Sequence, residues 1–385
     1  MLPRQPLALP FFALALAFAL AGCPPAGEGQ KGPGAAAVPD RASERVTPAR
    51  AAPSAPLAQR DVVPDASVVD ATAPALSPPA ALHHMTTPEL AALITLAPLA
   101  DGGVADPRES TYLKWVLVPQ PGRFNQGNIA LARHTIAKEQ CEAGLKDVVI
   151  QTPEQRARCG AENMVPIWKG GDPSKATACI DVFEFPNKPC ELPMVWGSPS
   201  QAARICQMQG KRLCAQEEWN LACGGDPAGG KPSTYAYGDE LDLDACNTQR
   251  PHDYRPDAIN WKCNVQSAQT AWDSCSTDTE PSGAFPRCKS RFGVYDQHGN
   301  VAEMMTRKAG PNDPESPSKT VTQLKGSAFF YVDVARQHDR PHPKDAKHDT
   351  YPDHCNYDPR WHVEAIEGAM HVNYHLGFRC CKDVR

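Results

Sequence analysis

Apolar and polar residues alternate at strand spacing in one stretch of the chain, residues 178–187, which ends at Pro186-Asn187. This period-two pattern predicts a strand with one face buried. A second short apolar segment, residues 192–196, follows after a few polar positions. Residues 126–148 instead place apolar side chains at helical spacing and predict a helix.

Two further helices are marked by their capping residues. Ser198, Pro199 and Gln201 supply a cap, a first-turn proline and a capping-box partner, and Gly210 ends that helix. Thr-Pro-Glu at residues 87–89 marks a shorter helix in the same way. A third helix is expected from Gln216 to Cys223, where Ala215 stands in the capping position and Trp219 is expected to anchor the core.

The first residues have the pattern of an export signal. A positive residue, Arg4, precedes an apolar run that is too short for a comfortable membrane span and that ends in Leu-Ala-Gly-Cys at Cys23. Small residues ahead of a cysteine are typical of a bacterial lipobox, so we expect residues 1–22 to be cleaved and Cys23 to carry a lipid anchor. Pro24 in the next position favours an outer-membrane lipoprotein facing the periplasm or the exterior. An ordinary cleaved signal with a chance cysteine is the alternative.

Residues 23–82 consist mainly of Ala, Pro and Gly with scattered charges. Such a segment cannot bury enough apolar surface to offset the cost of ordering it, and we expect a disordered tether. Residues 83–158 are interpreted as a helical N-terminal extension, either a separate subdomain or a layer packed on the main domain. The main domain is expected at residues 159–385.

Charge and cysteine content narrow the class of protein. A net charge of -5 argues against nucleic acid as a partner. Apart from Cys23, the chain has fourteen cysteines, all after residue 140, and in an exported chain this predicts up to seven disulfides. A zinc site is the rival interpretation, but no pair of C-x-x-C motifs exists. The adjacent Cys380 and Cys381 are expected to pair with different partners.

The stretch from Arg291 to Met304, RFGVYDQHGNVAEM, carries the clearest candidate chemistry. Asp296 and Glu303 flank a glycine-containing turn whose carbonyl groups could point inward, and this set of hard oxygen ligands suits calcium. A tight turn with solvated carboxylates is the simpler interpretation of the same spacing.

This stretch resembles the F-G-[LV]-Y-D-x-x-G-N-V-x-E signature of the formylglycine-generating enzyme, or sulfatase-modifying factor, family. Other motifs follow the family's order over residues 160–385. They are C-I-D-V-F-E at 179–184, G-K-R-L-C-A-Q-E-E-W at 210–219, Y-A-Y-G-D at 235–239, L-K-G-S at 324–327 and G-F-R at 377–379. The resemblance implies an irregular, loop-rich α+β fold of C-type-lectin-like type, here stapled by disulfides.

The resemblance also implies site residues. Asp296, Glu303 and the carbonyl groups of Gly299 and Val301 correspond to a structural calcium site, and Asn247 to a second one. Enzymatic members oxidise a sulfatase cysteine with copper(I), held by two cysteines whose positions here are Phe330 and Ala335. Since thiolates are the soft ligands that copper(I) prefers, their replacement argues against copper or iron as a cofactor.

Two hypotheses follow. The first is a lipid-anchored, non-catalytic binding or scaffold module of the cell envelope for a protein or glycan ligand. The second is a metal-dependent oxidoreductase that uses a histidine-rich segment together with Ser327, because imidazole also suits redox metals. The candidate residues of that second site are His338, His342, His371 and His375. Solvated loop histidines are the alternative interpretation of this segment.

Overall fold

The computed structural model describes residues 84–99, 101–248, 263–329, 354–359 and 362–385. All of these belong to one compact unit, which spans Thr72–Arg385. The predictions for the signal, Cys23 and the tether therefore lie outside the described residues. None of the helices in the described part has the length and hydrophobicity that a membrane crossing requires.

The described elements are short, and loops join most of them. The helices are α1 (Thr87–Ala92), α2 (Pro107–Val116), α3 (Lys138–Leu145), α4 (Pro153–Cys159), α5 (Pro199–Met208), α6 (Gln216–Gly224) and α7 (Ala268–Ser274), with 3-10 turns η1 (Pro173–Lys175) and η2 (Ile366–Gly368). The strands are β1 (Met164–Ile167), β2 (Ala178–Asp181), β3 (Arg212–Leu213), β4 (Ala302–Lys308), β5 (Thr320–Lys325), β6 (Leu376–Phe378) and β7 (Cys380–Asp383). This mixed, loop-rich α and β architecture confirms the predicted fold class.

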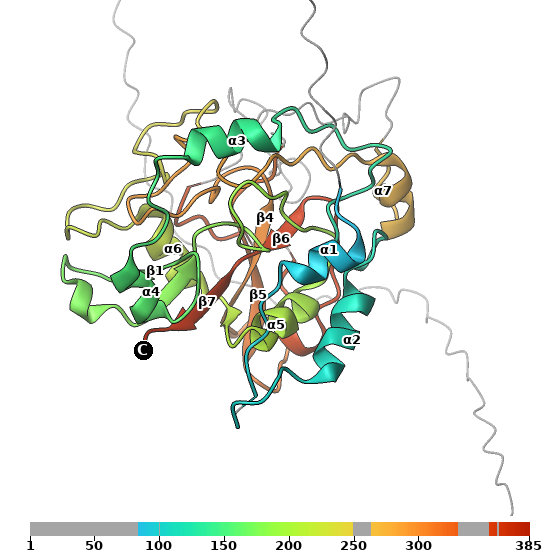
Figure 1. Ribbon diagram of the computed structural model, residues 1–385, viewed down its shortest axis with the longest axis horizontal. Helices are drawn as coiled ribbons and strands as arrows, with labels where there is room; N and C mark the ends of the chain where they lie inside the picture. The colour runs from blue at the N-terminus through green and yellow to red at the C-terminus, as the bar shows by residue number, and fades with distance from the viewer. Residues whose placement is uncertain (1–83, 100, 249–262, 330–353, 360–361) are drawn as a thin grey trace, which may run out of the picture. The chain divides into compact units, whose positions relative to one another are not determined.

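Two small sheets form the centre, with the helices placed around them (Figure 1). One sheet has the order β1-β2-β7-β3 and is antiparallel throughout. The other has the order β5-β4-β6, in which β4 runs antiparallel to β5 and parallel to β6. Because β6 and β7 are nearly continuous in sequence, the last ten residues of the chain link both sheets.

The predicted helix over 126–148 is wrong for its first half, and only α3 is helical there. The backbone N–H groups of Arg133, Thr135 and Ile136 donate to the carboxylates of Asp278 and Glu280 instead of to a helical turn. The predicted strand 178–187 is also shorter than expected, since β2 ends at Asp181. The caps of α1 and α5 form as predicted.

The stretch predicted to be an N-terminal extension packs into the main core. Leu90, Leu113 and Val116 lie in one apolar cluster with Ile205 and Phe378. Cys141 and Leu145 of α3 lie in another cluster with core residues of the main domain. These contacts place α1, α2 and α3 against the main domain.

Seven disulfides join all fourteen cysteines from Cys141 onwards. Cys380 and Cys381 pair with Cys206 and Cys214 respectively, as different partners, which confirms the prediction for these adjacent residues. The other pairs are Cys141–Cys190, Cys159–Cys179, Cys223–Cys355, Cys246–Cys288 and Cys263–Cys275. Three of the seven disulfides join residues more than 100 positions apart. Two of these three tie Cys206 of α5 and Cys214, next to β3, to strand β7.

Candidate functional site

The signature turn ends at Glu303, whose carboxylate is bound by a buried arginine. Glu303 lies in β4, and its partner in parallel β6 is Gly377, two residues before Arg379. The Nε atom of Arg379 donates to both carboxylate oxygens at 2.8 and 2.7 Å, and Nη2 makes a further bond to the same group. The indole Nε1 of Trp219 donates to Glu303 Oε2 at 2.7 Å. The register of two strands thus assembles the family's E and G-F-R motifs into one ion pair.

Arg379 also binds the backbone of the neighbouring segments. Its Nη1 donates to the carbonyl groups of Asp181 and Val182 at 3.0 and 3.2 Å, and its Nη2 donates to that of Tyr295 at 2.8 Å. The planar guanidinium offers several donors in a fixed geometry, so one side chain can hold the end of β2, the signature turn and β4 together.

Two more buried carboxyl groups lie close to this ion pair. Glu184 accepts hydrogen bonds from the backbone N–H of Val301 at 2.9 Å and from Asn300 Nδ2 at 2.6 Å. Burial raises the pKa of Glu184 well above its ordinary value, and the negative charges of Asp296 and Glu303 raise it further. Burial likewise raises the pKa of Asp296 to about 7, against the opposing effects of the Gly283 N–H bond and Arg379. One guanidinium cannot neutralise three buried carboxyl groups, which favours the protonated forms of Glu184 and Asp296.

The Glu303 carboxylate does not fit the calcium site predicted from the sequence. A calcium ligand presents its oxygens to the ion, whereas both Glu303 oxygens face a guanidinium and one also accepts from an indole. The positive charge that a calcium ion would supply is therefore already present in Arg379. Asp296, Gly299, Val301 and Asn247 stay predicted ligands that nothing in the structure tests.

The turn itself brings several of the predicted residues together. Gly299 has a φ of 73°, and a side chain there would meet the Asn247 carbonyl oxygen at 2.3 Å, so this position requires glycine. The Gly299 N–H donates to Ser327 Oγ at 2.8 Å, and Asn247 Nδ2 donates to Asn300 Oδ1 at 3.0 Å. These contacts give Ser327 and Asn247 a structural role around the turn.

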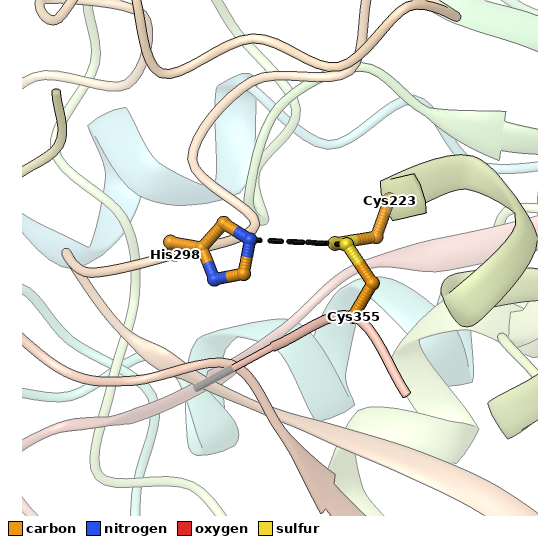
Figure 2. A group of neighbouring side chains, drawn as sticks. All are labelled: Cys223, His298 and Cys355. Atoms are coloured by element: carbon orange, nitrogen blue, oxygen red, sulfur yellow. Dashed lines mark hydrogen bonds between the residues drawn. A yellow bond between two sulfur atoms is a disulfide. The ribbon is translucent and has the colours of Figure 1, made fainter. Parts of the chain in front are cut away.

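His298, in the same turn, contacts the disulfide Cys223–Cys355. Figure 2 shows its imidazole facing the two sulfur atoms, with Nε2 at 3.5 Å from Cys223 Sγ and 3.9 Å from Cys355 Sγ. Cys223 comes from the end of α6, and all three side chains are buried. Within the described ranges, this is the one group of three ligand-type side chains close enough to share a metal ion.

The group does not fit a metal ion in its disulfide-bonded state. Metals bind thiolates, and both sulfurs are joined to each other. His298 Nε2 accepts the Ala236 backbone N–H at 3.0 Å, so its lone pair is already used. A disulfide sulfur has no proton to donate, and the contact of 3.5 Å is therefore one of packing.

The histidines proposed for a redox site are only partly described. His338 and His342 lie outside the described residues, as do Phe330 and Ala335. The rings of His362 and His371 stack with their centroids 3.8 Å apart, and the ring of His375 lies edge-on to that of Tyr374. Within the described chain, neither His371 nor His375 belongs to a group of three ligand-type side chains.

Reasoning from the sequence missed Arg379 and Glu184 as members of the central cluster. Both stand inside motifs that were recognised, G-F-R and C-I-D-V-F-E. The order of the motifs was visible in the sequence. The register of the strands decides which of their charged residues meet in the core, and the sequence does not give that register. Trp219 is buried as predicted, and its hydrogen bond to Glu303 is an additional role.

Comparison with known proteins identifies the family. The sulfatase-modifying factor enzyme 1-like domain model matches residues 130–384, and the chain belongs to this family. The match begins inside the stretch predicted to be an extension, in agreement with its packing on the core. No curated protein sequence matches significantly.

Solved structures give distant likenesses. The structure of CarF is 13% identical over 57% of this chain and 94% of its own, with a TM-score of 0.32. PvdO from Pseudomonas aeruginosa is 16% identical over 65% of this chain and 77% of its own, with a TM-score of 0.28. The P3c variant of the Major Tropism Determinant is 11% identical over 59% of this chain and 54% of its own, with a TM-score of 0.30. Similarities of this size carry no argument about function.

Proposed function

We propose that this protein is a non-catalytic binding module of the sulfatase-modifying factor family. One observation carries the proposal: every cysteine from Cys141 onwards is used in a disulfide. The oxidase chemistry expected from the resemblance needs two thiolates to hold copper(I), and the matching positions are Phe330 and Ala335. No thiol is then left in the folded part to replace them.

The buried polar groups support the same proposal. Glu303, Arg379 and Glu184 bond to each other or to the backbone around the signature turn, and all three are fully buried. Groups arranged in this way stabilise a loop-rich domain and face no solvent or substrate. The histidine beside the Cys223–Cys355 disulfide is likewise committed to a backbone amide.

We further propose that Cys23 carries a lipid that anchors the module to the cell envelope, with residues 23–82 as the tether. Small residues ahead of Cys23 support this anchor. Membrane fractionation of the full chain and of Cys23→Ala tests it. We expect the variant to leave the membrane fraction, and equal membrane association of both proteins would exclude the lipid anchor.

An activity assay tests the absence of catalysis. The purified chain, incubated with copper(I), oxygen, a thiol reductant and a cysteine peptide of the sulfatase type, is expected to form no aldehyde by mass spectrometry. An active enzyme of the family serves as the positive control in the same buffer. Aldehyde formation that needs stoichiometric copper or iron would overturn the proposal in favour of a metal-dependent oxidoreductase.

A further inference from the structure

A cleft of about 740 Å³ lies away from the signature turn. Its walls come from the loop after α1, from α4, from the turn after β2, from the end of α5 and from β7. Six of its lining residues are charged, namely Arg156, Glu162, Lys188, Lys211, Lys382 and Arg385. Its volume lies within the usual range of ligand sites in proteins.

The side chains that line the cleft are strongly biased toward positive charge. Five of them are basic, and Glu162 alone is acidic, although the whole chain carries a net charge of -5. A concave site of one sign concentrates the electric field and attracts ligands of opposite charge. The bias is therefore a local property of this cleft.

Only some of these charges are neutralised within the protein. Lys211 pairs with Asp181 at 2.6 Å behind the cleft wall, and Arg156 pairs with Glu162 at 2.7 Å in a solvent-exposed contact. Lys188, Lys382 and the Arg385 side chain make no ion pair with any carboxylate in the described part of the chain. Burial lowers the pKa of Lys382, and the nearby charges of Arg385 and Lys211 lower it further. An anion bound here would relieve this repulsion.

The remaining walls indicate what carries the anionic groups. Leu93, Leu96, Pro98, Pro153 and Pro186 provide aliphatic surface, and none of the lining residues is aromatic. Sugar rings bind preferentially against aromatic faces, whereas aliphatic side chains of a peptide pack well on Leu and Pro. A second hollow of about 490 Å³ shares Pro153, Arg156, Glu162 and Asn163 with the cleft and continues along residues 148–152, the loop before α4. Two adjoining hollows give room for several residues of an extended chain.

We propose that this cleft binds an extended acidic peptide segment of a partner protein, with carboxylates against Lys188, Lys382 and Arg385 and aliphatic side chains against the Leu and Pro walls. The inference rests on the proposed binding function and specifies its ligand.

Fluorescence anisotropy with the full chain tests this inference. The probe is a labelled peptide of alternating Glu and Leu, and the variant is Lys188→Glu/Lys382→Glu. A matched control, Lys146→Glu/Lys308→Glu, changes the net charge equally at exposed lysines outside the cleft. We expect saturable binding that weakens about tenfold or more in the cleft variant, because two attractive charges become repulsive. The control should keep the affinity of the unmodified chain, and added salt should weaken binding.

Three results would overturn the inference. They are absence of saturable binding, equal weakening in the two variants, and preference for a sulfated oligosaccharide over the peptide. The thermal unfolding midpoints of both variants, measured in parallel, separate loss of the site from loss of the fold. None of these results bears on the oxidase assay, so the cleft and the non-catalytic role fail independently.

Discussion

Arg379 and Glu303 form an ion pair in which neither side chain is more than 1% exposed, and the two residues are 76 positions apart in the sequence. Breaking a buried pair by removing one partner leaves an uncompensated charge in the core. Asp296 and Glu184 also lie near the guanidinium, so its removal leaves three buried carboxyl groups without their positive neighbour.

Arg379→Met should therefore destabilise the protein by about 3–5 kcal/mol in urea unfolding at neutral pH. Arg156→Met, which removes an arginine from the exposed pair with Glu162, serves as the control and should change little. Equal effects of the two substitutions would contradict the structural role assigned to Arg379.

Trp219→Phe should lower the free energy of unfolding by more than the loss of ring volume alone would. It removes the indole N–H that donates to Glu303 at 2.7 Å, and a buried carboxylate oxygen then loses a partner. Trp196 is a matched control, since it is equally buried and its Nε1 has no hydrogen-bond partner in the described chain. We expect Trp219→Phe to exceed Trp196→Phe by about 1–3 kcal/mol in unfolding free energy. Similar values for both would show that the bond contributes nothing.

The raised pKa of Asp296 predicts a specific dependence of stability on pH. An acid with a folded pKa of about 7, against an ordinary value of 3.8, keeps its proton in the native state after the unfolded state has lost it. Its contribution to stability is therefore fully present below about pH 4 and is lost as pH rises toward about 7.

Asp296→Asn tests this dependence, because the amide keeps an acceptor for the Gly283 N–H and does not titrate. Relative to the unmodified chain, the variant should gain up to about 4 kcal/mol between pH 4 and pH 8. Exposed Asp273→Asn should track the unmodified chain at every pH. If Asp296→Asn tracks it too, Asp296 is ionised in the native state throughout.

Chelator treatment tests the calcium prediction separately. Because both Glu303 oxygens are already bonded to Arg379 and Trp219, we expect excess EGTA to change the unfolding midpoint of Glu303→Gln by as much as it changes that of the unmodified chain. Ligand binding to the native state raises stability, so a marked fall on EGTA that calcium restores would show a bound ion. The same treatment of Asp296→Asn would then identify whether Asp296 holds it.

Local signals in the sequence specified the local structure well. The caps around Thr86 and Ser198 predicted the starts of α1 and α5, because a cap depends on residues three apart. The helical spacing of residues 126–137 misled, because Asp278 and Glu280, about 145 positions away, take up the backbone donors of that segment. Tertiary contacts therefore determine the backbone conformation of residues 126–137.

The candidate site shows the same division. The glycine turn at Gly299 and the burial of Trp219 were visible in the sequence, since each follows from residue type. The pairing of Glu303 with Arg379 depends on the register of β4 with β6, and the contact of His298 with Cys223–Cys355 depends on which cysteines pair. An even cysteine count predicts a disulfide framework but cannot give its connectivity.

Counting free thiols tests the central claim most directly. The full chain, denatured without reduction and treated with an alkylating agent, is analysed peptide by peptide by mass spectrometry, with copper(I) binding measured on the same preparation. We expect no alkylated cysteine from Cys141 onwards and no retained copper, because all fourteen of these cysteines form disulfides. Two alkylated cysteines together with stoichiometric copper(I) would contradict it, because the chain would then possess the thiolate pair that oxidase chemistry requires.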